Sequence, residues 1–349
     1  MLKPLLILCL MIPLMGSNAM AQNTGEVTER NWQEDVLGEG FEQITLQQPD
    51  DYEGEVFTTL VRSLPDTSVA NGRAVLYVHG YNDYFFQTEM ANRFTNRGYT
   101  FYAVDLRKYG RSWREHQQLT NVRDLSEYYA DIDSSLAIIR EAGHEWTLLA
   151  GHSTGGLVAA IYADARSDSP DFEALFLNSP FFDFNDGFFT RRIAIPFIAW
   201  RGKSNPDATV GSEEMSLYGK SLHREARGEW EFNTEWKTMD SQPVRYGWLR
   251  AIYQGHQKVA AGLDISVPVL VMHSDKTINA DEWTDDLFSG DAVLDVDHIR
   301  ERSEKISAPD LRIVEIEDGM HDLVLSREPV REKVYSEWFS WLEEITGNR

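Results

Sequence analysis

Short apolar segments alternate with amphipathic helical patterns through most of this chain, and this alternation limits its fold more than any other feature. The apolar runs are bounded by Gly, Asp, Pro or Ser, as expected of buried parallel strands, and lie at residues 74–79, 100–104, 147–150, 174–178, 267–273 and 311–316. Segments with apolar residues at three- and four-residue spacing lie at 83–97, 125–141, 155–166 and 329–345. The pattern predicts an α/β fold, a mostly parallel central sheet flanked by helices, with ligands gathering at the carboxyl ends of the strands.

Two regions interrupt this alternation. Residues 22–51 show little periodicity and are predicted to form an N-terminal surface segment before a first hairpin at about 54–65. From about 185 to 262 no strand pattern recurs, and an apolar stretch rich in aromatic residues precedes tryptophans in a charged background. This region is predicted to be a helical cap inserted between two strands. Some of its aromatic side chains pack the cap on the core, and others are expected to line an apolar pocket over the sheet edge. The candidates for the pocket are Phe188, Phe197 and Trp200.

The first residues have the form of a secretory leader. Lys3 gives a basic start, the apolar run at 5–14 is too short to span a bilayer, and 19–21 fits a small-x-small cleavage site. Residues 1–21 are predicted to be a signal peptide, with a retained N-terminal anchor as the alternative. The mature protein is expected to be periplasmic or secreted and not stably inserted in a membrane. Because the single cysteine, Cys9, lies in this leader, we expect no disulfide, thiolate metal site or cysteine nucleophile.

The charge of the chain excludes one broad class of partner. There are 33 Lys and Arg against 56 Asp and Glu, which gives a formal net charge of -23. General binding to nucleic acid or to anionic lipid requires Lys and Arg to neutralise phosphates, so neither is expected here. Disorder is excluded as well, because 42% of the residues are hydrophobic and 12% are aromatic.

The sequence GHSTGG at residues 151–156 is the clearest catalytic motif in the chain. It is a Gly-x-Ser-x-Gly sequence between a predicted strand and a predicted helix, and its glycines permit the sharp turn that exposes a serine Oγ above a sheet. Ser153 is therefore the predicted nucleophile, which needs an imidazole base and an acid to orient that base. His321 follows the last predicted strand at the same sheet edge and is the predicted base. His152 is expected to serve packing or a structural hydrogen bond.

A serine nucleophile also requires an oxyanion hole with two N–H donors. The predicted donors are the backbone amides of Thr154, directly after the nucleophile, and of Tyr81, on the loop after an early strand. Gly80 would let this loop approach a substrate closely. The alternative is that His79-Gly80 only terminates the strand.

These motifs together resemble those of a known family. The resemblance rests on the His79-Gly80 turn, the sequence DLRKYGRS at 105–112, the turn at 151–156 and the late His321. They are similar to the α/β-hydrolases of the serine aminopeptidase S33, or monoglyceride lipase and lysophospholipase-like, group, from about residue 55 onward. The resemblance implies a Ser-Asp-His triad in that chain order and a cap between strands six and seven. Residues 52–349 would then form one α/β-hydrolase domain with a cap at about 185–262. Lys108 stands where the family usually has glycine, which is expected to alter only a structural loop.

The position of the triad acid is ambiguous. In the family the Asp follows the penultimate strand within a few residues, and Thr277 occupies that place here. The family's pattern resumes after an insertion at 278–289, which favours Asp291 as the acid. Asp275, directly at the strand end, is the main rival. Two further acids, Asp295 and Asp297, also stay open.

The predicted function is a serine hydrolase of carboxylic esters that forms an acyl-enzyme. A monoacylglycerol, a lysophospholipid or a similar lipid-like ester fits the apolar cap, and the acidic charge favours dispersed neutral or zwitterionic substrates. No metal or other cofactor is expected, because the sequence lacks His-Glu-x-x-His, a Walker loop and a complete calcium loop. Two alternatives remain, a catalytically inactive binding protein and an S33-type aminopeptidase whose acids bind a substrate ammonium group. The acids considered for that role are Glu213, Glu214, Glu229 and Glu231.

Overall fold

The central element of the structure, a computed structural model, is a nine-stranded sheet with the strand order β1-β2-β3-β5-β4-β6-β7-β13-β15. The structure describes residues 30–212 and 214–347, so the predicted signal peptide and Cys9 lie outside the described residues. The strands of this sheet are β1 (Gln33–Glu34), β2 (Glu42–Asp51), β3 (Gly54–Ser63), β4 (Arg73–Val78), β5 (Thr100–Asp105), β6 (Trp146–His152), β7 (Ala174–Asn178), β13 (Val269–Ser274) and β15 (Leu311–Ile316).

The strands from β5 to β15 in this order pair in parallel, and β1, β2 and β3 pair antiparallel at one edge. The predicted α/β fold with a mostly parallel sheet is confirmed.

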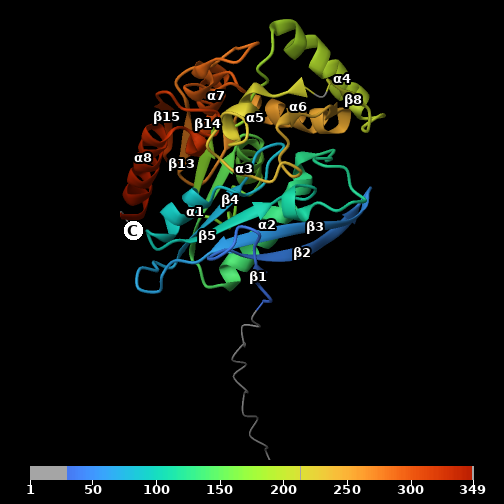
Figure 1. Ribbon diagram of the computed structural model, residues 1–349. Coiled ribbons are helices and arrows are strands. Elements are labelled where there is room, and N and C mark those ends of the chain that lie inside the picture. Colours follow the sequence, from blue (N-terminus) through green and yellow to red (C-terminus); the bar gives the residue numbers. More distant parts are fainter. Residues whose placement is uncertain (1–29, 213, 348–349) are drawn as a thin grey trace, which may run out of the picture. The chain divides into compact units, whose positions relative to one another are not determined.

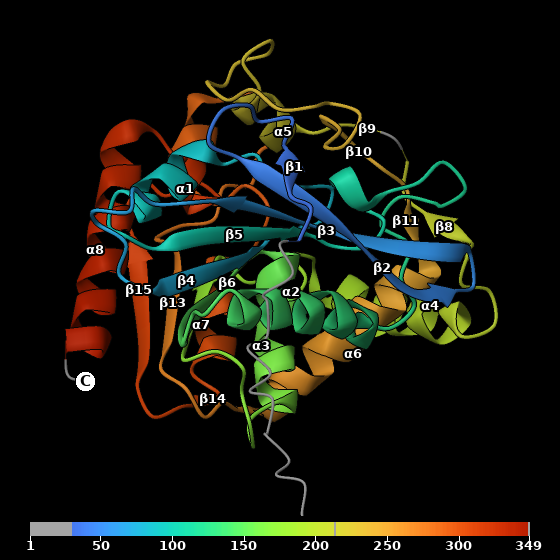
Figure 2. The same cartoon turned by 90° about the horizontal axis from the view of Figure 1, so that it is seen from below.

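Helices cover both faces of the sheet, and each face has its own apolar core (Figure 2). Successive side chains of a strand point to opposite faces, so Leu76 of β4 belongs to one core and Tyr77 to the other. The helices over the first face are α2 (Tyr129–Glu141) and α3 (Thr154–Ala165), and those over the second are α1 (Thr88–Thr95) and α8 (Glu328–Gly347). Parallel strands buried on both faces explain the unbroken apolar runs in the sequence.

Part of the N-terminal segment that was predicted to lie on the surface before the first hairpin is itself a strand of that hairpin. Residues 42–51 form β2, so the first hairpin joins β2 to β3 rather than beginning near residue 54. Ile44 and Leu46 are its alternating residues that pack against the core, and the other positions are polar because β2 lies near the sheet edge. Pro49 falls where the pairing register shifts between Gln48 and Asp51, a place where a strand tolerates proline. Because β2 has only two apolar core residues among polar ones, its sequence lacks the apolar run by which the other strands were predicted.

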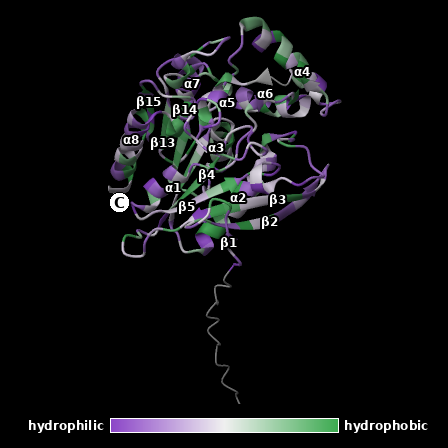
Figure 3. Ribbon diagram, viewed as in Figure 1, coloured by the Kyte–Doolittle hydropathy of each residue, from purple (hydrophilic) through white to green (hydrophobic). Residues whose placement is uncertain are grey.

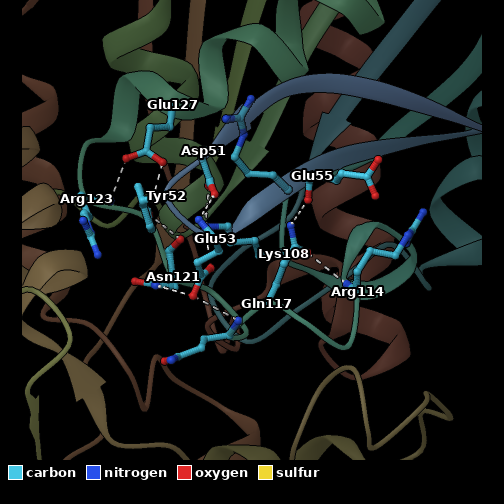
Figure 4. Close-up of polar contacts among 12 residues, drawn as sticks. Asp51, Tyr52, Glu53, Glu55, Lys108, Arg114, Gln117, Asn121, Arg123 and Glu127 are labelled. Carbon is cyan, nitrogen blue, oxygen red and sulfur yellow. Dashed lines mark hydrogen bonds and ion pairs between the residues drawn. The ribbon is translucent and has the colours of Figure 1, made fainter.

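Lys108 holds the tip of this hairpin (Figure 4). Its side chain is fully buried, with Nζ 2.6 Å from Asp51 Oδ2 and 2.7 Å from Glu53 Oε2. The backbone of Lys108 has a φ of 64°, in the left-handed region that favours glycine, which explains why glycine suits this place in the family. Besides altering the loop after β5, Lys108 therefore adds an ion-pair connection from this loop to the β2–β3 hairpin.

The region 185–262 lies between β7 and β13, on the side of the sheet away from β2 and β3 (Figure 1). Its helices are α4 (Ile195–Gly202), which continues a π-helical turn η3 (Thr190–Ala194), α5 (Leu217–Leu222) and α6 (Tyr246–Ala261). It also contains two antiparallel pairs, β8 (Thr209–Val210) with β11 (Val244–Arg245) and β9 (Glu214–Met215) with β10 (Asp240–Ser241). Strands of two residues are too short for any periodicity, so the sequence did not reveal them.

The remaining elements follow this region or connect the strands. They are β12 (Leu263–Asp264), which pairs with β14 (Ile306–Ser307), α7 (Val296–Ser303), and the 3-10 turns η1 (Gly110–Ser112), η2 (Leu125–Tyr128), η4 (Asp285–Phe288) and η5 (Leu323–Leu325). Among the described residues, no helix has both the length and the apolarity needed to cross a membrane.

Candidate active site

The turn from β6 into α3 holds Ser153 in an unusual backbone conformation. Its φ is 52° and its ψ is −116°, outside the regions that L-residues normally adopt. The turn is possible because its glycines carry no side chain. A Cβ on Gly155 would lie 2.2 Å from the carbonyl oxygen of His79, and one on Gly151 would lie 2.5 Å from that of Gly155. The Gly-x-Ser-x-Gly spacing is thus a steric requirement of this turn.

Ser153, His321 and Asp291 form one hydrogen-bonded chain. His321 Nε2 lies 2.9 Å from Ser153 Oγ, and His321 Nδ1 lies 2.9 Å from Asp291 Oδ2. The other oxygen of Asp291 accepts backbone N–H groups from Val293 at 2.8 Å and Leu294 at 2.7 Å. Because Asp291 is fully buried, these bonds supply the partners that its carboxylate would otherwise find in water. The carboxylate selects the tautomer in which Nδ1 donates and Nε2 accepts.

The insertion after β13 explains how Asp291 reaches this place. The chain leaves at Ile278 and returns so that Asp291 pairs with Thr277 in a parallel bridge. Ile278 N–H donates to the carbonyl of Asp291 at 2.7 Å, and Asp291 N–H donates to the carbonyl of Lys276 at 2.9 Å. Asp291 therefore lies beside the position where the family's sequence pattern puts its acid.

The three alternative acids have other partners. Asp275 accepts the backbone N–H of Asp318 at 2.9 Å. Asp295 caps α7 by accepting the N–H of Asp297, whose own carboxylate accepts from Arg300 at 2.7 Å. Among the four candidate acids, the structure brings Asp291 to His321.

His152 is a second buried histidine next to His321. The His152 ring packs 4.9 Å from the His321 ring, and His152 Nδ1 lies 3.3 Å from the carbonyl oxygen of Asn178. This agrees with the expected packing or structural hydrogen bond. Burial lowers the pKa of His152, and this effect outweighs the opposite influence of the nearby Asp322 carboxylate. His152 therefore stays neutral at neutral pH.

Asp322 and Tyr218 are site neighbours that the sequence analysis missed. Asp322 accepts hydrogen bonds from Asn178 at 2.8 Å and from Gln87 at 3.2 Å. Tyr218, on α5, accepts the N–H of Asp322 at 3.1 Å, and its ring lies edge-on 5.5 Å from the His321 ring. The position of Asp322 beside His321 was the available signal for one of them. No sequence pattern singles out Tyr218.

The loop after β4 lies against the serine. A Cβ on Gly80 would be 3.2 Å from Ser153 Cβ, so glycine permits this approach. His79 Nδ1–H donates to the Gly80 carbonyl at 2.8 Å, and His79 Nε2 accepts the N–H of Leu106 at 3.1 Å. His79-Gly80 thus follows the end of β4 and also fixes the next peptide group, which leads to Tyr81.

A cavity of about 640 Å³ opens over these residues. Ser153, His321, Tyr81 and Thr154 all line it. Most of its remaining wall is apolar and includes Phe181, Phe184, Ile195, Ile198, Leu222, Phe232, Trp248, Leu249 and Leu294.

The expectation that Phe188, Phe197 and Trp200 line a pocket is wrong. These side chains are 73%, 60% and 65% exposed, and none is among the cavity residues. The helical spacing turns Ala194 and Ile198 toward the cavity and therefore turns Phe197 away from it.

The acids considered for binding an ammonium group are not gathered at the cavity as far as the structure describes them. Glu229 pairs with Arg331 at 2.7 Å and Glu231 with Arg224 at 2.9 Å, and neither lines the cavity. Glu213 and the side chain of Glu214 lie outside the described part of the chain. An acid that does line the cavity, Asp83, is paired with Lys237 at 3.1 Å. No group of three or more potential metal ligands occurs among the described residues.

The sheet order, the strand-to-helix turn at Ser153 and the Ser-His-Asp geometry define an α/β-hydrolase. More specifically, residues 70–328 match the family described as serine aminopeptidase, S33, and the chain belongs to this family.

A relative of the chain is the AB hydrolase superfamily protein YisY of Bacillus subtilis (strain 168), which is 27% identical over 215 residues, or 60% of this chain and 75% of that protein. The fold is similar to that of a soluble variant of monoglyceride lipase from Saccharomyces cerevisiae, solved with a substrate analog. The TM-score is 0.64 at 15% identity, covering 86% of this chain and 94% of the other. The monoacylglycerol lipase of Paleococcus ferrophilus has a TM-score of 0.57 at 19% identity, covering 81% and 98%.

Proposed function

We propose that the protein is a serine hydrolase that cleaves carboxylic esters with a lipid-like acyl chain, such as a monoacylglycerol or a lysophospholipid. The observation that carries the proposal is the hydrogen bond of Ser153 Oγ to His321 at the wall of a largely apolar cavity. A hydroxyl with a base at 2.9 Å is prepared for attack, and an apolar wall favours an acyl chain over water.

The reaction proceeds in two steps. His321 Nε2 takes the proton of Ser153 as Oγ attacks the ester carbonyl, and the same nitrogen then gives this proton to the leaving alcohol. Water, deprotonated by His321, attacks the acyl-enzyme and releases the acid, and the proton returns to Ser153. Asp291 holds the imidazole in the required tautomer and stabilises the imidazolium.

The amides of Thr154 and Tyr81 are proposed to hold the oxyanion. Support for Tyr81 comes from His79, which binds the Gly80 carbonyl at 2.8 Å. In a trans peptide the N–H points opposite to the carbonyl, so the Tyr81 N–H points away from His79. Tyr81, Thr154 and Ser153 line the same cavity, as this role requires.

The choice of ester over amide rests on the cavity wall. Several cap residues in the wall are apolar, and they include Ile195, Leu222 and Trp248. Three acids, Asp83, Asp186 and Asp240, also line the wall, and Asp83 is paired with Lys237. Two structural neighbours are named as monoglyceride or monoacylglycerol lipases, which supports the same substrate class. Residues 1–21 are proposed to direct export, on the strength of their leader pattern.

The test is a series of p-nitrophenyl esters of increasing acyl length and a monoacylglycerol, assayed beside aminoacyl naphthylamides. We expect kcat/KM to rise with acyl length into the medium or long range, because each buried methylene adds apolar contact with the cavity wall. The Ser153→Ala variant is the control for contaminating esterases. Hydrolysis of the naphthylamides without hydrolysis of the esters would establish the aminopeptidase function instead.

A further inference from the structure

The helical segment from Phe188 to Trp200 exposes a row of large apolar side chains, which we call the docking face. The docking face consists of Phe188, Phe189, Ile193, Phe197 and Trp200, with exposed fractions of 73%, 67%, 53%, 60% and 65%. From Phe189 to Trp200 the spacing is four, four and three residues, which puts these side chains on one side of a helix. Figure 3 shows hydrophobic stretches along this helix at the top of the view, on the side opposite β2 and β3. Contiguous exposed apolar groups mark an interaction site.

The neighbouring side of the same segment forms part of the cavity wall. Thr190, Ala194, Ile195 and Ile198 line the cavity that contains Ser153. One short segment therefore presents apolar side chains to solvent on one side and to the cavity on the other. An apolar molecule held against the docking face would lie next to the wall of the cavity.

The charge of this segment is opposite to that of the chain. Residues 187–206 contain Arg191, Arg192, Arg201 and Lys203 and no Asp or Glu, although the whole chain has a net charge of -23. Exposed aspartates, Asp186 and Asp207, lie directly before and after this segment. Arg191 is engaged with Asp183 at 3.5 Å. Arg192, Arg201 and Lys203 are exposed, and among the described side chains none of the three forms an ion pair with a carboxylate.

We propose that the docking face binds the surface of a membrane or lipid aggregate that contains anionic phospholipid. Phe and Trp side chains enter the boundary between headgroups and acyl chains, and flanking Arg and Lys side chains pair with lipid phosphates. The overall negative charge does not prevent this contact, because at physiological salt charges farther away than about 8 Å are screened. For this face the proposal departs from the expectation, based on net charge, that anionic bilayers are disfavoured. Vesicle binding is independent of the proposed function, whereas delivery of lipid esters to Ser153 rests on it.

The test compares how the full chain and its variants partition onto sedimented vesicles of phosphatidylcholine, with and without phosphatidylglycerol. The apolar variant carries Phe189→Ser, Phe197→Ser and Trp200→Ser together. The charge variant carries Arg192→Glu, Arg201→Glu and Lys203→Glu. We expect the wild-type chain to bind the mixed vesicles, and each variant to bind at least about tenfold more weakly, because each loses one of the two contributions to surface binding.

The matched control replaces three exposed apolar residues elsewhere, as Val36→Ser, Leu64→Ser and Val69→Ser, which are 67%, 53% and 49% exposed in the native chain. It should bind like the wild type. All these chains keep residues 1–21, so binding through the N-terminal apolar run would survive in the apolar variant and would overturn the proposal. An unchanged thermal unfolding midpoint shows that a variant has folded, without reference to activity.

Two other outcomes would distinguish lipid binding by the docking face from the proposed ester hydrolysis and from dimerisation through the same face. Vesicle binding without ester hydrolysis would refute the proposed function and leave the docking face standing. A wild-type dimer that the apolar variant converts to a monomer, with no vesicle binding by either, would assign the face to a second copy of the chain and overturn the lipid proposal.

Discussion

At the scale of single residues, the proposed chemistry depends on how the carboxylate of Asp291 is held. One of its oxygens accepts from His321 and the other from the amides of Val293 and Leu294. A buried carboxylate with this set of donors is fixed in direction. It is therefore prepared to orient the imidazole before any substrate arrives.

Replacing Asp291 by Asn should lower kcat by about 10⁴-fold, because an amide no longer selects the tautomer in which His321 can accept the serine proton. The matched variant is Asp275→Asn. Asp275 contacts the backbone N–H of Asp318 and not His321, so its replacement should change kcat no more than a few-fold. Steady-state hydrolysis of one p-nitrophenyl ester by both variants decides between these acids. A large loss in Asp275→Asn with little change in Asp291→Asn would reverse the assignment.

Sequence reasoning could identify Ser153 and His321 as candidates because each lies next to a local signal. Ser153 is surrounded by the glycines that its turn requires, and His321 follows a recognisable strand. Asp291 could be proposed as the acid only with the help of the family's sequence pattern, because its position depends on a pairing with Thr277 across an insertion. Tyr218 could not be found, since its contact with the site arises only when α5 packs over the sheet.

At the scale of elements, the β2–β3 hairpin and the loop after β5 are joined by the buried Lys108. Its ammonium group lies between the carboxylates of Asp51 and Glu53, whose side chains are 11% and 12% exposed (Figure 4). Buried charges are tolerated when they are paired, and removing one partner leaves the others uncompensated.

The Lys108→Met variant should therefore be less stable by about 3–5 kcal/mol, measured as the free energy of unfolding in urea. The variant that also carries Asp51→Asn and Glu53→Gln should recover most of this loss, because no unpaired charge is then buried. If Lys108→Met is as stable as the wild type, the ion pairs do not hold the hairpin.

The elements differ in how far they could be predicted. The buried strands and long helices were visible because both faces of the sheet are apolar and the helices are amphipathic. The strand β2 was not visible, since a strand near the sheet edge with one packed face and a proline carries a weak pattern. The exposed aromatic side chains of the cap could not be placed correctly from the sequence. Helical periodicity shows which residues share one face of a helix, but it does not show which face lines the cavity.

At the scale of the whole molecule, charge and apolar surface are distributed unevenly. The chain is strongly acidic, yet residues 187–206 carry four basic residues and no acid beside the docking face. Net charge is an average over the chain and says little about one short segment. The proposal that the docking face binds lipid therefore rests on its exposed aromatic side chains and local basic residues, and not on the charge of the whole chain.

The central claim is that Ser153 is a nucleophile activated by His321. Its most direct test is labelling of the folded chain with a fluorophosphonate, which forms a bond from Ser153 Oγ to phosphorus and releases fluoride, followed by mass spectrometry of the peptides. We expect one label per chain, on Ser153, and labelling at least about 10³-fold slower in His321→Ala. The exposed His116→Ala variant should label at the wild-type rate. Absence of label on Ser153 in the folded wild-type chain, or equal labelling in His321→Ala, would contradict the account.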